Sequence, residues 1–439
     1  MKLADIIETF ISGDWGEESP SNDTPNAVYC VRGADIVPIT NHRFNDIPQR
    51  YVCQRTVDSK MLQAGDLIIE KSGGSPTQST GRIVYVSDDL IREKGNIVCS
   101  NFCTALRVKS EWNPLYVFYY WQNVYNHDAF FNFEGKTSGI KNLQLDNALS
   151  AIEIEYLPLE NQNKIVASLS AIDEKLKINR QINDNLEAMA NQLYDYWFIQ
   201  FDFPNEEGYP YKSSGGKMAW NEKLKREIPE GWNVVEFKDL IEANRGISYN
   251  SDTISGGGIP MINLASFNID GTYKHSGIKT YNGSYSEDKI LKPFDLVMCN
   301  TQQTAIDFSK DIIGKAFLVP FIFEGDVVSS HHVTTLTPKQ KELKAYIAYL
   351  SNTKHFHKYV TGCCSGTNIM GINYMGLSQY KMEVPPLSIL QQFESRIIQI
   401  EERKGLIILE NENLIKQRDE LLPLLMNGQA SVNYHLSAY

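Results

Sequence analysis

The chain of 439 residues has no long hydrophobic run. A helix that crosses a membrane needs roughly 18 to 20 consecutive residues that are mostly apolar. The first ten residues, MKLADIIETF, carry acidic side chains where a signal peptide carries basic ones before an apolar core. We therefore expect no membrane span and no secretion signal, and a cytoplasmic location.

Cysteine and positive charge are both scarce. The seven cysteines are an odd set without a CxxC pair, which argues against a disulfide framework or a zinc site. The formal net charge is −11, so the chain does not coat nucleic acid by bulk electrostatics. Any contact with nucleic acid must come from local patches or be helped by a basic partner. The length predicts roughly two to four globular domains.

Catalytic motifs are also missing. Asn113–Tyr116 resembles the Asn-Pro-Pro-Tyr box of amino-methyltransferases, but Leu115 replaces the second proline and no glycine-rich cofactor loop accompanies it. We expect a turn that leads into a helix. Gly256–Gly258 lacks the Lys-Ser/Thr of a phosphate loop, and His331 and His332 have no third metal ligand at a useful spacing. The sequence therefore predicts no catalytic residue and no metal site. For His331 and His332, we expect a role in packing or in DNA contact.

The dominant feature of the chain is a long internal repeat. Leu3–Glu8 matches Phe237–Glu242, and Gly65–Ile69 matches Phe294–Met298. One constant offset of 229 positions relates three residue pairs: Asp66 and Asp295, Ile140 and Ile369, and Gln162 and Gln391. A repeat this long is a domain rather than a solenoid unit, because solenoid units recur about every 20 to 50 residues. A duplicated domain with a pseudo-two-fold relation suits a partner that is itself double or read in two pieces.

Two kinds of sequence alternate within each copy. Short strand-like runs separated by Gly, Asn, Ser and Pro, together with helical stretches such as 115–124 and 343–350, predict compact α+β domains. A long helix follows each domain. We place the first domain at residues 1–155 and the first helix at 156–200. A connecting segment follows at 201–233, then the second domain at 234–383, the second helix at 384–428 and a tail at 429–439.

The long helices carry heptad-like stripes. The stripe of the first helix comprises Ile165, Leu169, Ile172, Leu176, Leu186, Ala190 and Leu193, and that of the second Phe393, Ile397, Ile400, Ile407, Leu414, Leu421 and Leu425. Asn179 and Asn183 interrupt the first stripe, Pro423 is expected to end or kink the second helix, and Asn427–Gly428 to stop it. The first stripe is about 55 Å long. We expect one intramolecular antiparallel coiled coil in which the asparagines fix the register; two separate surface helices are the alternative.

At this point the chain resembles the specificity subunit of type I restriction-modification systems, over essentially its full length. The likeness lies in the order of domain, Leu-Pro-Leu helix, second domain and second helix. Four local segments share it: Gly65–Pro76, Lys175–Pro204, Ile228–Trp232 and Leu421–Gln429.

The resemblance implies a fold of two similar target recognition domains separated by the paired helices. Each domain would read one half of a split site in double-stranded DNA, and the helices would fix the unread gap. Two modification subunits would dock on the helices and on the aromatic residues Tyr194, Tyr196, Trp197 and Phe198, and restriction subunits can join the complex. S-adenosylmethionine and the flipped adenine would lie on the modification subunits, so the chain itself would hold no cofactor and would not be an enzyme.

Candidate DNA contacts are polar and basic residues on loops, since these side chains bind bases and phosphates. The first pair of loops sits at matching places in the two copies: Lys71, Ser72, Gly73, Gly74, Ser75, Thr77, Gln78 and Arg82 in one, and Asn300, Thr301, Gln302, Gln303 and Thr304 in the other. The second pair comprises Lys136, Thr137, Ser138 and Lys141, and Ser365, Thr367 and Asn368. For each loop a solvated turn is the alternative. Replacing Lys71 and Arg82 with alanine is expected to weaken one half-site only.

A different class of protein also fits the acidic charge. A two-fold scaffold that joins two copies of a partner subunit needs no sequence-dependent contact with DNA. The two hypotheses differ in whether DNA binding is salt-sensitive and sequence-dependent.

Overall fold

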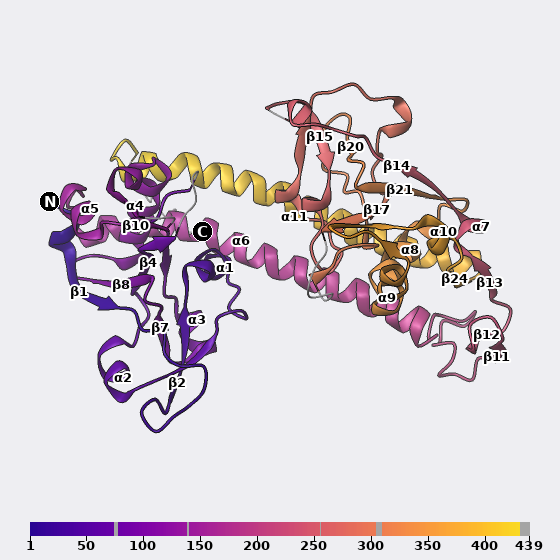
Figure 1. The fold of residues 1–439 in the computed structure, drawn as a ribbon, viewed down its shortest axis with the longest axis horizontal. Helices are drawn as coiled ribbons and strands as arrows, with labels where there is room; N and C mark the ends of the chain where they lie inside the picture. The colour runs from indigo at the N-terminus through magenta and orange to yellow at the C-terminus, as the bar shows by residue number, and fades with distance from the viewer. Residues whose placement is uncertain (74–77, 138–139, 255, 304–309, 431–439) are drawn as a thin grey trace, which may run out of the picture. The chain divides into compact units, whose positions relative to one another are not determined.

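The computed structural model describes residues 1–73, 78–137, 140–254, 256–303 and 310–430. The chain divides into two compact units. Unit 1 comprises Met1–Ile178 with the C-terminal segment from Asn413, and unit 2 comprises Asn179–Glu412 (Figure 1). Within the described ranges, no helix is both long and apolar enough to cross a membrane.

The described residues of unit 1 form three sheets. The four-stranded sheet is antiparallel in the order β1 (Ile7–Ser12), β8 (Cys103–Val108), β4 (Leu67–Glu70), β6 (Ile83–Tyr85). A second sheet has the order β3 (Gln49–Val52), β2 (Asn26–Val31), β7 (Ile97–Cys99), with β2 and β7 parallel. A small third sheet has the order β5 (Ser72–Gly73), β10 (Ile140–Leu143), β9 (Glu134–Thr137).

Unit 2 repeats these three sheets strand for strand. The four-stranded sheet has the order β14 (Ile241–Arg245), β21 (Val333–Pro338), β17 (Leu296–Cys299), β19 (Ala316–Leu318). The second has the order β16 (Lys279–Tyr281), β15 (Ile259–Ile262), β20 (Val328–Ser329), with β15 and β20 again parallel. The third has the order β18 (Thr301–Gln303), β23 (Ile369–Ile372), β22 (Cys364–Ser365). The duplication predicted from the sequence is therefore a duplication of the whole strand arrangement.

Shorter helices and strand pairs accompany the sheets in each unit. In unit 1 these are the helices α1 (Ile36–Thr40), α2 (Gln54–Lys60), α3 (Asp88–Lys94), α4 (Pro114–Asn126) and α5 (Leu145–Ala151). In unit 2 they are α7 (Phe237–Leu240), α8 (Leu343–Asn352), α9 (Lys354–Gly362) and α10 (Tyr374–Ser378), and the strand pairs β11 (Met218–Asn221) with β12 (Arg226–Pro229) and β13 (Asn233–Glu236) with β24 (Lys381–Val384).

The Asn-Pro-Leu-Tyr segment begins α4, as predicted. The Asn113 Oδ1 accepts hydrogen bonds from the amides of Leu115 and Tyr116 at 2.8 and 3.3 Å, and Pro114 occupies the first helical turn. A side chain that caps free amides and a proline that needs no amide partner both favour a helix start. The motif thus has a structural explanation within the domain.

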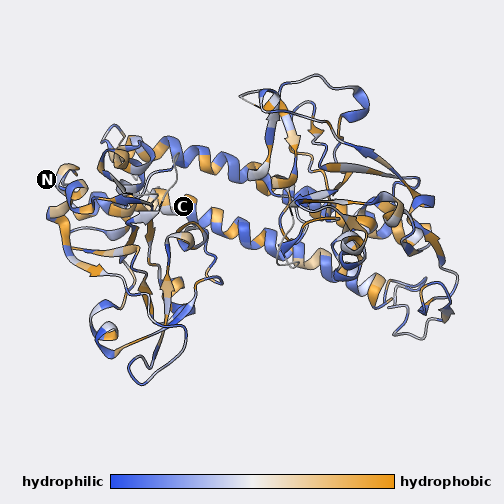
Figure 2. Cartoon of the chain, in the orientation of Figure 1, coloured by the Kyte–Doolittle hydropathy of each residue, from blue (hydrophilic) through white to orange (hydrophobic). Residues whose placement is uncertain are grey.

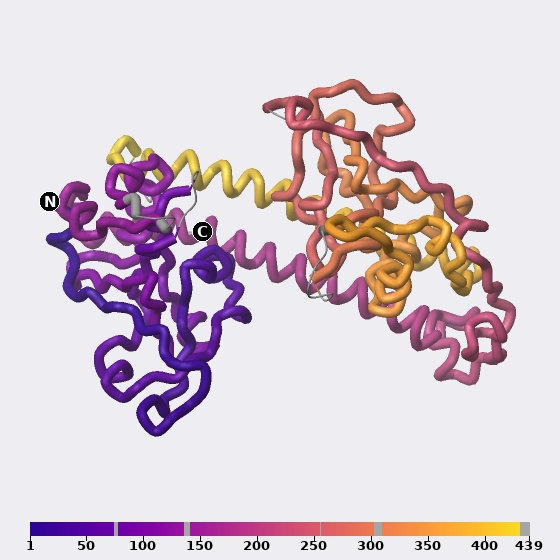
Figure 3. The backbone as a smooth tube through the Cα atoms, in the orientation of Figure 1, coloured from indigo at the N-terminus to yellow at the C-terminus, as the bar shows by residue number. Residues whose placement is uncertain are grey.

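Two long helices, α6 (Leu159–Tyr194) and α11 (Leu387–Met426), follow the two domains, and both are traced in Figure 3. Hydrophilic and hydrophobic residues alternate along both of them (Figure 2). In unit 1 the Arg418 guanidinium lies 3.4 Å from Asp173. In unit 2 the Asn179 side chain donates to Asn411 at 2.8 Å and Lys404 pairs with Glu187 at 2.7 Å. Residue numbers rise on one helix as they fall on the other, so the helices are paired and antiparallel, as expected.

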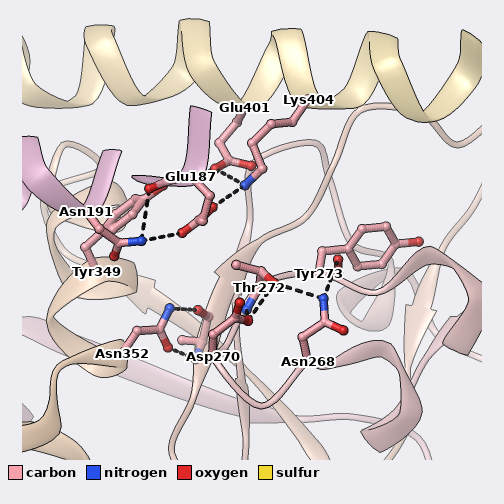
Figure 4. Close-up of polar contacts among 11 residues, drawn as sticks. Glu187, Asn191, Asn268, Asp270, Thr272, Tyr273, Tyr349, Asn352, Glu401 and Lys404 are labelled. Carbon is pink, nitrogen blue, oxygen red and sulfur yellow. Dashed lines mark hydrogen bonds and ion pairs between the residues drawn. The ribbon is translucent and has the colours of Figure 1, made fainter. Parts of the chain in front are cut away.

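Polar residues lie between the two helices, and Asn179, which the sequence placed in the first stripe, is one of them. Asn179 is 1% exposed, and its amide also donates to Glu410 at 2.8 Å. Lys404 lies between Glu187 and Glu401 beside Tyr349 (Figure 4). Burial lowers the pKa of Lys404, but the two carboxylates outweigh that effect and raise the pKa above its ordinary value. A charge held by two carboxylates in one place favours one alignment of the helices.

One residue of the second stripe was wrong. Leu421 is exposed and Leu422 is buried instead, together with Leu425 and Met426. These three side chains belong to the hydrophobic core of unit 1, so the last turns of α11 pack on the domain as well as on α6. Pro423 was expected to end or kink the helix; it lies inside α11, which runs on to Met426 and stops at Asn427–Gly428 as expected, so Pro423 does not end it.

Candidate nucleic-acid interface

The third sheet of each unit brings the two predicted DNA-contact loops together. In unit 1, Ser72 and Gly73 on β5 pair with Asn142 and Lys141 on β10, which pairs in turn with Lys136 on β9. These loops lie about 70 residues apart in the sequence, as the pairing of Ser72 with Asn142 shows. Backbone pairing alone therefore joins the two sets of candidates.

Unit 2 has the same arrangement. Thr301 on β18 pairs with Gly371 on β23, and Gly371 pairs with Ser365 on β22. Ser365, Thr367 and Asn368 are exposed. The matched candidates of the two copies thus occupy the same small sheet.

A tight turn adjoins this sheet in each unit. In unit 1 it is Ser100–Phe102, between β7 and β8, and the Phe102 carbonyl accepts from the amides of Lys71 and Ser72 at 2.8 and 3.2 Å. The Phe102 side chain is 58% exposed. A hydrophobic ring in that position stays in water although the backbone beneath it is fixed by two hydrogen bonds.

In unit 2 the turn is Ser330–His332, between β20 and β21. The His332 carbonyl accepts from the Asn300 amide at 3.0 Å, and the His332 Nδ1 lies 2.6 Å from the Thr301 hydroxyl. The rings of His331 and His332 are 3.8 Å apart, and Tyr249 lies against both. Imidazole, hydroxyl and amide groups therefore gather where unit 1 has a phenyl ring.

Positive charge accompanies this histidine turn. The Arg245 Nε donates to the His331 carbonyl at 2.8 Å, and the Lys279 ammonium lies 5.7 Å from the Tyr249 ring centre; both cations are exposed. Burial and the Arg245 charge lower the pKa of His331, and burial, His331 and Arg245 lower that of His332. The lowered pKa values favour the neutral imidazoles at pH 7, each with one donor and one acceptor nitrogen.

The type I restriction modification DNA specificity domain matches this chain twice, over residues 1–188 and 229–416. The chain belongs to this DNA specificity family. The two matches coincide with the two repeats of sheets and helix, which confirms the fold class and the resemblance found in the sequence. The family supplies sequence recognition, so the prediction of a non-catalytic recognition subunit is also confirmed.

Individual relatives of this specificity protein are distant. The HindI specificity subunit of Haemophilus influenzae is 21% identical, with 93% of this chain and 95% of that protein covered. The MjaIX specificity subunit of Methanocaldococcus jannaschii is 26% identical over 65% of this chain and 62% of its own length. The crystal structure of the S subunit from M. genitalium has a TM-score of 0.54 at 14% identity, covering 97% of this chain and 95% of that one, and supports the fold.

Two basic candidates of the specificity protein are engaged inside unit 1. Arg82 holds Glu70 with two hydrogen bonds of 2.6 and 2.8 Å, and the Glu70 side chain is only 4% exposed. Lys141 pairs with Glu134 at 2.9 Å and lies over the Phe131 ring. Such pairing gives Arg82 above all a structural role, and it leaves Lys71 as the stronger candidate for DNA contact.

The remaining candidates differ in how much the structure describes of them. Side chains are described for Gln78, which is exposed, and for Asn300, which is buried and donates to Thr334 at 2.7 Å. The Gln302 side chain accepts from the Ile312 amide. Lys136, Thr137 and Gln303 are placed on their strands by the backbone alone. Outside the described residues lie Gly74, Ser75, Thr77, Ser138 and Thr304.

The four aromatic candidates for partner binding separate into two sets. Tyr194, Trp197 and Phe198 are buried in the core of unit 2 around Phe393, whereas Tyr196 is exposed. The three buried rings serve the packing of unit 2, and a partner-binding role stays a prediction for Tyr196. Among the described residues no group of three or more His, Cys, Asp or Glu side chains is arranged to bind a metal ion.

Proposed function

We propose that each unit reads one half of a two-part DNA sequence through the small sheet and the adjoining turn. The main observation in its support is that all three sheets recur with the same strand order in both units, while the side chains on the equivalent turns Ser100–Phe102 and Ser330–His332 differ. Two domains that recognise different sequences require equal backbones with different side chains, since bases are distinguished by side-chain contacts to their edges.

The paired helices belong to the same proposal. α6 has 36 residues and α11 has 40, which makes each helix about 54 to 60 Å long. Their buried polar register supports a role in fixing the gap between the half-sites. Two modification subunits would dock along them, with Tyr196 as a candidate contact, and restriction subunits can join.

Chemistry would occur on those partners. The modification subunits would bind S-adenosylmethionine and flip the adenine, and the complex would act in the cytoplasm. The net charge of −11 supports this division, because an acidic chain gains DNA affinity when a partner adds positive charge.

Selection from a random duplex library tests the proposal. The chain is mixed with its modification subunit, bound duplexes are sequenced, and binding is repeated at two salt concentrations. A two-part motif is expected, with affinity that falls as salt rises. Enrichment of no motif, with equal binding to all duplexes, would favour the two-fold scaffold instead.

A matched pair of variants sharpens the selection experiment. Lys71→Ala is expected to weaken one half-site and to reduce the salt slope by about one, as for the loss of one phosphate contact. Lys94→Ala removes the same charge from unit 1, but Lys94 pairs with Glu93 and lies over Tyr29. This control is expected to leave the motif unchanged.

A further inference from the structure

The turns Ser100–Phe102 and Ser330–His332 are held by the same backbone contacts. The Cys103 amide donates to the Ser100 carbonyl at 2.9 Å, and the Val333 amide donates to the Ser330 carbonyl at 2.8 Å. Asp14 and Ile247, which follow the edge strands, donate to Cys99 and Ser329, both at 2.7 Å. The two turns are therefore structural equivalents.

A glycine makes room for each turn. A Cβ on Gly13 would lie 1.9 Å from the Ser100 carbonyl oxygen, and a Cβ on Gly246 would lie 2.2 Å from that of Ser330. Neither position tolerates a side chain without moving the turn. Each turn is thus fixed between an edge strand on one side and the start of β5 or β18 on the other.

The side chains on these equivalent turns have opposite chemistry. The exposed Phe102 offers only apolar surface, whereas His332 at the matching place is half-buried and offers a ring nitrogen. Because Thr301 contacts Nδ1 of His332, the remaining nitrogen is Nε2. Turns with the same fixed backbone and different side chains select different partners with little loss of conformational entropy.

We infer that these turns determine specificity, Phe102 by contacting the methyl group of a thymine in one half-site and His332 by hydrogen-bonding a base edge in the other. The inference rests on the proposed function and names the residues that would contact the bases. Apolar side chains distinguish thymine in the major groove through its C5-methyl group, which the other three bases lack. A polar ring at the matching place reads donors and acceptors instead.

The test uses the full chain with its modification subunit and the two-part motif that the wild type selects. Phe102→Ala should relax one position of one half-site, and that position should be an A·T pair. His332→Ala should relax one position of the other half, by about fivefold or more. Phe10→Ala and His355→Ala are the controls, since both residues are exposed elsewhere in units 1 and 2 and should change neither half.

Uracil in place of thymine provides a second measurement that leaves the protein intact. At the position relaxed by Phe102→Ala, this change removes one methyl group and should weaken wild-type binding about fourfold. It should have no further effect on the Phe102→Ala variant.

The failures are distinguishable. If the wild type selects no two-part motif, the proposed function fails. A two-part wild-type motif that Phe102→Ala and His332→Ala leave intact, or blur equally in both halves, overturns the assignment of the turns alone.

Discussion

Replacing Arg82 with alanine tests whether this residue stabilises unit 1 or contacts DNA. The guanidinium makes two hydrogen bonds to Glu70, whose side chain is 4% exposed while that of Arg82 is 19% exposed. Removing one partner of a buried ion pair costs about 3 to 5 kcal/mol, because the other charge stays buried without compensation. We expect the lower end, about 3 kcal/mol, since Arg82 is partly exposed.

That loss is large enough to measure by calorimetry. For a unit of this size each kcal/mol lowers the melting temperature by about 2 to 4 °C, so Arg82→Ala should lower the transition of unit 1 by about 6 to 12 °C. The double variant Glu70→Met with Arg82→Met removes both charges at similar volume, and such replacements are often neutral or stabilising. It should melt near the wild type and select the same motif.

The opposite result would refute this reasoning. If Arg82→Ala melts like the wild type and loses one half-site, or if the stable double variant loses it, Arg82 reads DNA as its sequence position suggested. The structural account requires the double variant to keep both the melting temperature and the selected motif of the wild type.

Three further perturbations have definite expected outcomes. Asn179→Leu should raise the melting temperature of unit 2, because a buried polar residue in a helix seam fixes register at some loss of stability; an unchanged or lower value in calorimetry would contradict this. Burial lowers the pKa of His331 and His332 below 6.5 in the folded chain. As the pH drops, the unfolded chain therefore binds protons before the folded chain does, and the free energy of unfolding should fall between about pH 7 and pH 5. Thermal melting at several pH values measures this. Replacing both His331 and His332 with alanine should make the stability less dependent on pH in this range. Gly246→Ala would place a Cβ 2.2 Å from the Ser330 carbonyl oxygen and should impair the half-site of unit 2 while unit 1 selects normally.

The duplication and the helix pairing could be predicted because both are patterns of local residues. Constant offsets reveal a repeat whatever its fold, and a heptad stripe requires a partner. The order of the strands in the sheets could not be predicted. It depends on long-range pairs such as Ser72 with Asn142, and a strand of two residues leaves no periodicity to detect.

The candidate site was predicted in part for the same reason. The candidate loops were chosen from residue type, and the adjoining turn at Phe102 was not among the candidates, since a phenylalanine between two strands suggests core. Arg82 was assigned to the loop although Glu70 ends a buried strand and needs a cation. The helical spacing of Tyr194, Trp197 and Phe198 places them on one face, and this signal could have marked them as core residues.

The most direct test of two-unit reading is a base-resolution methylation map of cells that express the modification subunit with and without this chain. The account predicts a new adenine motif in two parts that appears only with the chain. A map without any new motif, although the two proteins purify together, would contradict DNA recognition by this chain.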